Sequence, residues 1–303
     1  MTTKSKSSNY PSPLIFTPLL SHKTTLILLH GRGSAAERFS EALLKNPVSP
    51  LSTTTPKDPT NLPEIQTFRD CFPHTKFVFP TASLRRAVAF NRSLTRQWFD
   101  LWNLDLPEEK QHLQAQGLRG TAEFLHDLLR TEIEAVGPKN VVLMGLSQGC
   151  AAILVATLLW EGEPFAGVVG MCGWLPFRKG MRDAVDDDEG EEEGREDVFE
   201  RNEMLDKEKT KIQRAVEWLR DEIDLNGSGK AAEMPPFRTI PLFMGHGAED
   251  FVVDCELGRL AVELLAKIDV NTRWELYEGL AHWYSEDMLR DVVKFIKELE
   301  GWG

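Results

Sequence analysis

The sequence lacks the marks of several large protein classes, and each absence narrows its function. Its four cysteines are scattered and form no CxxC pair, so neither a disulfide framework nor a cysteine-based metal site is expected. No apolar run reaches the roughly 18 residues that a membrane-spanning helix needs. The formal net charge of −12 argues against a partner made of nucleic acid. Reduced thiols in an acidic globular protein indicate a cytoplasmic location.

The N-terminal region carries no clear targeting signal. The first 36 residues contain no acidic residue and many serines, threonines and lysines, as transit peptides do. A single arginine and a core strand that starts by Thr24 argue against that interpretation. The stretch PSPLIFTPLL is too short and too interrupted by proline for a secretory signal. Residues 1–10 are predicted to be a disordered tail.

Two stretches of biased composition interrupt the folded sequence. Residues 186–197 contain nine acidic residues against one arginine, a net charge of −8 in one short run. Residues 46–63 contain five prolines and a cluster of serines and threonines. Neither stretch can bury itself, so both are predicted to be surface loops, and the acidic run is predicted to be disordered.

Short apolar segments alternate with segments of helical periodicity. The expected strands are residues 14–20, 24–30, 76–80, 140–144, 165–172, 239–244 and 272–277. The expected helices are residues 121–136, 150–160, 212–223 and 286–299. A further helix is expected to start at a capping box formed by Ser34 and Glu37, and Pro18 places the first strand at a sheet edge. This alternation predicts an α/β fold whose mostly parallel sheet has helices on both faces.

Residues 140–160, NVVLMGLSQGCAAILVATLLW, combine a strand, the motif GxSxG and an apolar helix. Glycine at positions 145 and 149 suits a sharp turn, because Cβ atoms there would collide across it. The turn lifts Ser147 to the top of a sheet and to a helix N-terminus, where N–H groups favour developing negative charge. Since GxSxG also occurs by chance, the flanking strand and helix carry the prediction of a nucleophile.

A serine nucleophile needs a base, and the base needs an orienting carboxylate. In α/β-hydrolases both partners follow the serine, the acid before the histidine. Only two histidines follow Ser147. His246 precedes the well-placed acids and fails this order, whereas His282 follows the last expected strand and is predicted as the base. Chain order does not separate the three candidate acids, which are Glu249, Asp250 and Asp254.

Two further segments are candidates for the site. The loop GRGS follows a buried strand, where a hydrolase of this kind places a backbone N–H for an oxyanion, here that of Arg32. The segment QWFDLWNLDL carries Trp98, Phe99 and Trp102, which are expected either to anchor a loop on the core or to line a pocket.

The chain resembles the acyl-protein thioesterase group of the phospholipase/carboxylesterase family. The resemblance runs in order through LLHGRGS, FVFPTA, QWFDLW, GLSQGC, GWLP, HGAEDFVV and YEGLAH. It implies an α/β-hydrolase fold with Ser147 as nucleophile, Asp250 as acid and His282 as base. It also implies oxyanion N–H groups at Arg32 and Gln148. The acyl-binding wall that it implies consists of Trp98, Phe99, Trp174 and Leu175.

The sequence departs from the family pattern in several places. Ser34 replaces the usual aspartate after HGxG, and Cys150 replaces a small residue. Trp283 and Tyr284 replace small residues after the base, so Trp283 is expected to narrow the substrate pocket. Residues 177–238 replace a short link, and their helix is a candidate lid. With a second insertion at about 45–67, residues 11–303 are expected to form one domain.

We therefore expect a hydrolase of carboxylic esters or thioesters that works through an acyl-enzyme without a metal or organic cofactor. Its acyl substrate is expected to be a small molecule or a lipidated protein. One alternative is a general carboxylesterase for short or secondary-metabolite esters. An alternative of a different class is a hydrolase-fold interaction protein whose acidic segment binds a basic partner, but such a protein has no need of Ser147, Asp250 and His282 together. Chain length and composition predict no oligomeric state.

Overall fold

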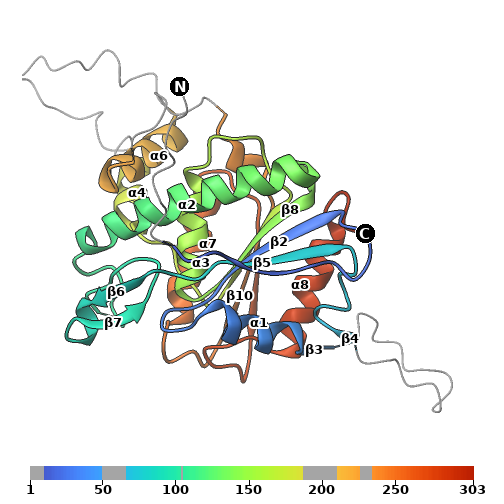
Figure 1. The fold of residues 1–303 in the computed structure, drawn as a ribbon. Helices are drawn as coiled ribbons and strands as arrows, with labels where there is room; N and C mark the ends of the chain where they lie inside the picture. Colours follow the sequence, from blue (N-terminus) through green and yellow to red (C-terminus); the bar gives the residue numbers. More distant parts are fainter. Residues whose placement is uncertain (1–9, 50–65, 104, 187–209, 226–233) are drawn as a thin grey trace, which may run out of the picture.

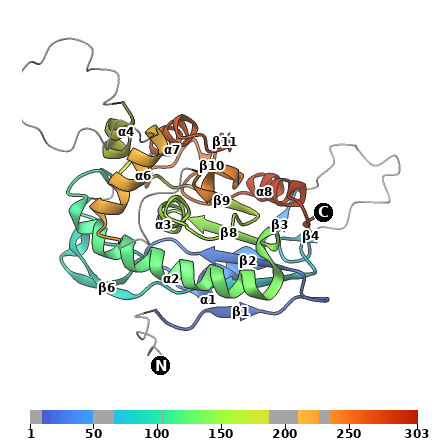
Figure 2. The ribbon, with the colours of Figure 1, turned by 90° about the horizontal axis from the view of Figure 1, so that it is seen from above.

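The computed structural model describes residues 10–49, 66–103, 105–186, 210–225 and 234–303. Within these ranges seven strands form one sheet in the order β1-β5-β2-β8-β9-β10-β11 (Figures 1 and 2). The strands run parallel except β1, which pairs antiparallel with β5 at one edge. The expected α/β fold with a mostly parallel sheet is confirmed.

The elements have the following bounds. The strands of the sheet are β1 (Leu14–Phe16), β2 (Thr24–Leu29), β5 (Thr75–Phe79), β8 (Val141–Leu146), β9 (Gly167–Met171), β10 (Leu242–Gly247) and β11 (Thr272–Tyr277). Two separate antiparallel pairs are β3 (Pro47–Val48) with β4 (Gln66–Thr67) and β6 (Leu84–Ala87) with β7 (Ser93–Arg96). The α-helices are α1 (Ala36–Leu44), α2 (His112–Val136), α3 (Gln148–Leu158), α4 (Arg178–Asp186), α6 (Lys211–Glu222), α7 (Cys255–Lys267) and α8 (Glu286–Glu298).

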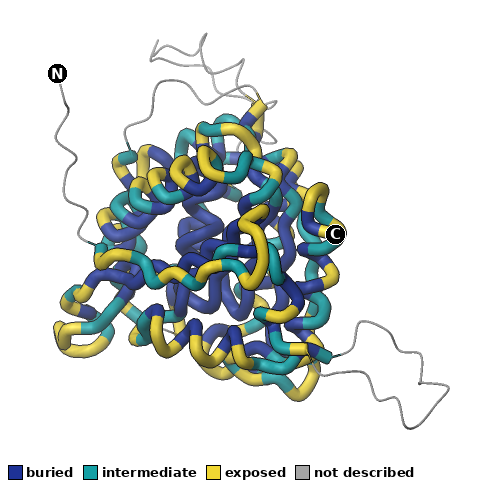
Figure 3. The backbone as a smooth tube through the Cα atoms, turned by 45° about the vertical axis from the view of Figure 1, so that its right-hand side comes forward, coloured by how far each residue is buried: buried dark blue, intermediate teal, exposed yellow. Residues whose placement is uncertain are grey.

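Helices cover both faces of the sheet, with α3 to one side and α8 to the other (Figure 2). Successive residues of β2 therefore point into two different buried clusters. Ile27 and Leu29 join the cluster that contains residues of α2, α3 and α7, whereas Leu26 and Leu28 join that of α1 and α8. Figure 3 shows the resulting buried centre in dark blue. This double cover explains why the central strands are apolar runs rather than alternating sequences.

The N-terminal region differs in detail from the prediction. Residues 1–9 of the expected tail lie outside the described residues, but Tyr10 is packed: its ring stacks on Phe124 with 4.4 Å between centroids. Its hydroxyl lies 2.7 Å from Thr121 Oγ1. β1 is shorter than expected, and it does occupy an edge as Pro18 indicated.

The predicted capping box at the start of α1 is wrong. The N-cap residue is Ala35, and no side chain of the cap accepts a hydrogen bond. Instead, the N–H of Ala36 donates to Thr81 Oγ1 at 3.3 Å, from the loop after β5. An acceptor distant in the sequence has taken the place of the local one.

Two other elements begin at different residues from those predicted. α2 begins at His112 rather than at residue 121, and β10 begins at Leu242 because residues Pro236–Thr239 form a 3₁₀ turn. α4, α7 and the hairpin β6–β7 were not expected from the sequence pattern. No helix among the described residues is both long enough and apolar enough to cross a membrane.

The described part of the insertion 177–238 packs into the main core. α4 and α6 lie against each other, and their apolar faces join the buried cluster that contains α2 and α3 residues (Figure 1). Arg220 of α6 pairs with Glu161, and Asp224 pairs with Arg119 of α2. The acidic run beyond Asp186 and most of the loop 46–63 lie outside the described residues.

Gly117 of α2 lets this helix touch the segment that carries Trp98 and Phe99. A Cβ atom at Gly117 would lie 2.5 Å from Phe99 Cα, and a backbone atom cannot rotate away. We expect Gly117→Ala to lower the free energy of unfolding by about 1–3 kcal/mol in urea denaturation.

Gly120 is the matched control in the same helix. The nearest atoms to a Cβ there are side-chain atoms 3.9 Å away. Gly120→Ala should leave the stability unchanged or raise it by up to about 1 kcal/mol, because alanine is the better helix former. Equal destabilisation by the two substitutions would contradict this account of the contact.

Candidate active site

Ser147 lies in the turn between β8 and α3, with φ of 57° and ψ of −121°. This is a strained backbone for a residue with a side chain. A Cβ at Gly145 would lie 2.5 Å from the carbonyl carbon of Gly149, and a Cβ at Gly149 would lie 2.5 Å from the oxygen of Leu29. The motif GLSQG therefore forms a turn in which the ends of β2, β8 and α3 touch through backbone atoms.

Side chains from the carboxyl ends of three strands form a chain of hydrogen bonds. His282, after β11, has Nε2 2.8 Å from Ser147 Oγ and Nδ1 2.7 Å from Asp250 Oδ2, after β10. A carboxylate oxygen can only accept, so Nδ1–H of His282 donates to Asp250. Nε2 is then the nitrogen left to accept the hydroxyl proton of Ser147.

Asp250 accepts hydrogen bonds from four donors. Oδ1 accepts the N–H groups of Val252 and Val253, each at 2.9 Å, and Oδ2 accepts His282 and, at 3.1 Å, Nε2–H of His246. Burial by itself raises the pKa of Asp250, but the hydrogen bonds from the two histidines and Val253 outweigh it and hold the pKa well below its ordinary value. Asp250 is therefore a negative charge at neutral pH.

His246 belongs to this cluster, although chain order set it aside as a base. Its side chain is fully buried, and Nε2–H is shared between Asp250 and the carbonyl oxygen of Val253 at 3.0 Å. Nδ1 has no partner in the described part of the chain and faces Gly258, where a Cβ would lie 2.6 Å from it. The signal that could have revealed it is a histidine at a strand end, four residues before an acid.

A cavity of 200 Å³ opens beside Ser147 and His282. Its wall comes from the carboxyl ends of several strands and includes Arg32 after β2 and Trp174 after β9. A group bound there would lie against both the serine hydroxyl and the imidazole.

A model of the family described as Phospholipase/Carboxylesterase matches residues 60–187 and 225–300, more than half of the sequence. The chain belongs to this family.

Individual relatives agree with that membership. Acyl-protein thioesterase 1 of Gibberella zeae is 24% identical over 296 residues, which cover 96% of this chain and 97% of that protein. Carboxylesterase SOBER1 of Arabidopsis thaliana is 23% identical over 74% of this chain and 77% of its own length. The crystal structure of Zea mays acyl-protein thioesterase 2 has the same fold, with a TM-score of 0.63 at 21% identity over 97% of this chain and 100% of that chain. The protein is thus an α/β-hydrolase-fold enzyme of the class that cleaves carboxylic esters or thioesters.

The two residues expected at the oxyanion both line the cavity with Ser147. Gln148 is the first residue of α3, and the first N–H groups of a helix have no acceptor within it. Its side chain is turned into the neighbouring loop, where Oε1 accepts the N–H of Trp98 at 3.0 Å and Nε2 donates to the oxygen of Phe99 at 2.8 Å. The side-chain amide of Gln148 is therefore occupied by this loop, and its backbone N–H is among the N-terminal groups that have no acceptor within α3.

The expected acyl-binding residues fall into two sets. Trp174 and Trp283 line the cavity, whereas Trp98, Phe99 and Leu175 are buried outside its lining. Leu101, from the same segment as Trp98, stands on the wall instead. Of the four residues that the resemblance named, Trp174 lines the cavity and the other three do not, because the resemblance does not show which member of a segment faces inward.

Trp98 and Phe99 anchor their loop on the core, which is the first of the two roles left open by the sequence. Trp98 Nε1–H donates to the oxygen of His30 at 2.8 Å, and its own carbonyl oxygen accepts the Thr121 hydroxyl at 2.8 Å. Phe99 packs edge-on against Trp174, with ring centroids 6.0 Å apart, and so stands behind the cavity wall.

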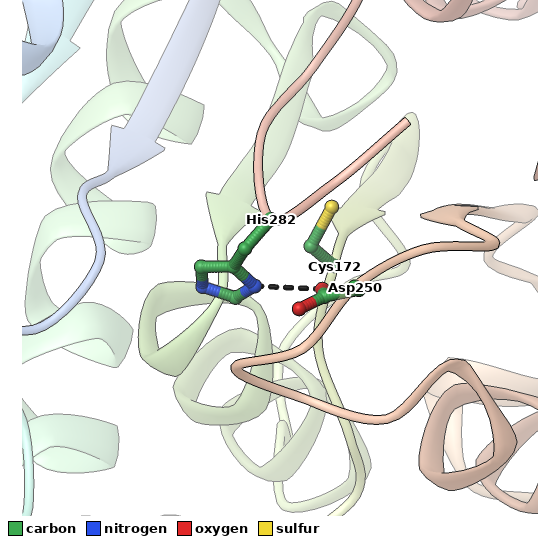
Figure 4. Close-up of side chains that lie close together, drawn as sticks. All are labelled: Cys172, Asp250 and His282. Atoms are coloured by element: carbon green, nitrogen blue, oxygen red, sulfur yellow. Dashed lines mark hydrogen bonds and ion pairs between the residues drawn. The ribbon is translucent and has the colours of Figure 1, made fainter. Parts of the chain in front are cut away.

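Cys172, directly after β9, is a third side chain beside the Asp250–His282 pair (Figure 4). Its Sγ, a carboxylate oxygen and an imidazole nitrogen lie within 4.8 Å of one another, as in some metal sites. However, the thiol donates to the oxygen of Trp283 at 3.2 Å, and burial raises the pKa of Cys172 to about 12. Metals bind the thiolate form, so this cluster is better described as packing around the pair.

The helix predicted as a lid does not cover Ser147. None of the described residues of α6 lines the cavity, and its apolar stripe, which includes Ile212 and Leu219, is buried against the core. The stripe covers α4 and the helical layer on this face of the sheet. The lid interpretation was therefore wrong for the described part of this segment.

The hydrogen bond between His246 and Asp250 can be tested by substitution of His246. His246→Leu removes one donor from Asp250, so the carboxylate and His282 lose part of their fixed geometry. We expect kcat for ester hydrolysis to fall about 10- to 100-fold, measured by steady-state kinetics. His246→Gln, which keeps an N–H donor, should retain more activity.

Thermal melting of both variants separates a positioning effect from a loss of fold. A folded Leu variant with the activity of the wild type would show that Asp250 needs no support from His246.

Proposed function

We propose that Ser147 is the nucleophile of this hydrolase, His282 the general base and Asp250 the carboxylate that orients the base. The observation that carries the proposal is the unbroken chain of hydrogen bonds from Ser147 through His282 to Asp250, at 2.8 and 2.7 Å. Asp250 holds the proton of His282 on Nδ1, and Nε2 is then free to act as a base toward the serine.

In the acylation step, His282 Nε2 takes the hydroxyl proton as Ser147 Oγ attacks the carbonyl carbon of the substrate. The backbone N–H groups of Arg32 and Gln148 receive the oxyanion of the tetrahedral intermediate. The bond from carbon to the leaving oxygen or sulfur then breaks, and His282 returns its proton to the leaving alcohol or thiol. The product that remains is an acyl ester of Ser147.

In the deacylation step, His282 takes a proton from water, and the resulting hydroxide attacks the acyl carbonyl. The same N–H groups receive the second oxyanion. The bond to Ser147 Oγ breaks, the serine regains its proton from His282, and the carboxylic acid leaves. The same residues serve both steps, so no further group is required.

The cavity favours a compact acyl group. Its volume is 200 Å³, and the bulky Trp174 and Trp283 stand on its wall. Ligand pockets for larger molecules commonly reach about 300–1,000 Å³. Among the relatives, both thioesterases and a carboxylesterase are named, and both linkages need the same chemistry. A short acyl chain on a small alcohol or thiol is therefore the preferred substrate, ahead of a lipidated protein.

The cytoplasm is the compartment that best fits the cysteines. All four are free, and three of them are buried. Oxidising compartments favour disulfide formation, whereas the cytoplasm keeps thiols reduced.

Ser147→Ala tests the nucleophile. A fluorophosphonate probe should label the wild-type protein covalently, and the variant should show no labelling, because the attacking oxygen is gone. Ser34→Ala is the matched control, since Ser34 lines the same cavity but is not bonded to His282. Its labelling should persist. Labelling of a folded Ser147→Ala variant would refute the assignment.

Trp283→Ala tests the limit on acyl length. Trp283 lines the cavity and is 44% exposed, so its removal should open the cavity at its mouth. Across p-nitrophenyl esters of increasing chain length, kcat/KM of the variant should shift toward longer chains by about tenfold relative to acetate. Trp102 is similarly exposed, at 42%, but lies outside the cavity lining. Trp102→Ala should keep the wild-type profile, and an identical profile for Trp283→Ala would contradict the role of Trp283.

A further inference from the structure

The Arg32 side chain has no evident role in the reaction as described, in which only its backbone N–H takes part. Arg32 is one of the residues that line the cavity containing Ser147 and His282. Of the residues that line the wall, Arg32 is the one whose side chain carries a fixed charge. A positive charge beside the reacting atoms contrasts with the chain's net charge of −12.

The guanidinium of Arg32 forms no ion pair with an acid in the described part of the chain, and its Nη1 is buried without a hydrogen bond there. Burial lowers the pKa of Arg32 to about 10, with Asp100 opposing that shift, so Arg32 is charged at neutral pH. Asp100 directs Oδ1 elsewhere, to the N–H groups of Val88 and Leu101. A buried cationic donor without an acceptor is unfavourable, and an anionic oxygen would satisfy it.

The surroundings hold this guanidinium in place. Its central carbon lies 4.3 Å from the centroid of the Phe90 ring, at the tip of the β6–β7 hairpin. The N–H of Gly33 donates to the oxygen of Arg96 at 2.8 Å and so ties the Arg32 loop to β7. Stacking on a ring restrains the plane of a guanidinium while its N–H groups at the rim can still bind an anion.

A second donor in the same cavity also lacks a partner. Trp174 lines the wall, and its Nε1–H is buried without a hydrogen bond among the described residues. Arg32 and Trp174, both on the cavity wall, thus each have a donor without a partner among the described residues.

We infer that Arg32 binds an anionic group of the substrate, a carboxylate or a similar oxyanion, and thereby selects esters or thioesters that carry a negative charge near the scissile carbonyl. This inference rests on the proposed function. The anion can lie on the acyl side, as in a half-ester of a dicarboxylic acid, or on the leaving group, as in a thioester of a thiol acid.

The test compares substrates in matched pairs. On the acyl side, the 4-methylumbelliferyl half-ester of adipic acid is compared with the hexanoate ester. On the leaving side, S-butyryl 3-mercaptopropionate is compared with its methyl ester. For each pair, the ratio of kcat/KM for the anionic substrate to that for the neutral one is measured. Each protein is its own reference, so a change in the shared chemistry cancels.

Arg32→Met keeps the backbone N–H and removes the charge, and Arg32→Lys keeps the charge but not the planar donor pair. We expect Arg32→Met to lower the ratio about 10- to 100-fold in at least one pair, mainly through KM, and Arg32→Lys to lower it less. Arg38 is exposed on α1 and outside the cavity lining. Arg38→Met changes the net charge equally and should keep the wild-type ratio.

The substrate pair whose kcat/KM ratio falls in Arg32→Met identifies the side of the substrate that carries the anion. If a folded, active Arg32→Met variant keeps the wild-type kcat/KM ratio in both substrate pairs, the role of Arg32 is overturned and the proposed function stands. Failure of the wild type to cleave any of the four substrates would instead overturn the proposed function, and this inference with it.

Discussion

The close approach of α3 to the end of β2 is the contact on which the rest of the site depends. A side chain at Gly149 would overlap the carbonyl oxygens that end β2, and backbone atoms cannot move aside. This contact sets the first turn of α3, and with it both Ser147 and the N–H of Gln148. His30 at the same point stays neutral: burial lowers its pKa to about 4, and Nε2 accepts the N–H of Ala82 at 3.1 Å. The turn that carries Ser147 is thus packed against uncharged groups.

The parallel sheet then does the remaining positioning. β10 and β11 are paired neighbours, so the loops that follow them bring Asp250 and His282 together at the same edge as Ser147. Strand pairing determines where these loops begin, and hydrogen bonds fix the side chains within them. The cavity wall has a different origin, because Arg32, Trp174 and other residues come from loops that the sheet positions less strictly. In the proposed mechanism, the sheet therefore positions the reacting side chains, while the substrate preference depends on individual loop side chains.

The GxSxG motif with its flanking strand and helix predicted the turn at Ser147. Chain order predicted His282, because in a parallel sheet the carboxyl ends of the strands lie at one edge. It did not choose the acid, since Glu249, Asp250 and Asp254 share one loop; the resemblance proposed Asp250. In the structure it is Asp250 that accepts a hydrogen bond from His282, at 2.7 Å, whereas Asp254 caps α7 by accepting the N–H of Glu256 at 2.9 Å. The buried orientation of Trp98 depends on contacts with His30 and Thr121, which are distant in the sequence, so local patterns could not predict it.

The central claim is that turnover passes through an acyl group on Ser147. The most direct measurement mixes the protein with a slowly released acyl ester, quenches with acid, and locates the acyl group by peptide mass spectrometry. The account predicts one acyl group, on the peptide that contains Ser147, whose decay matches the rate of turnover. An acyl group that turns over on another residue, such as the partly exposed Cys255, would contradict it.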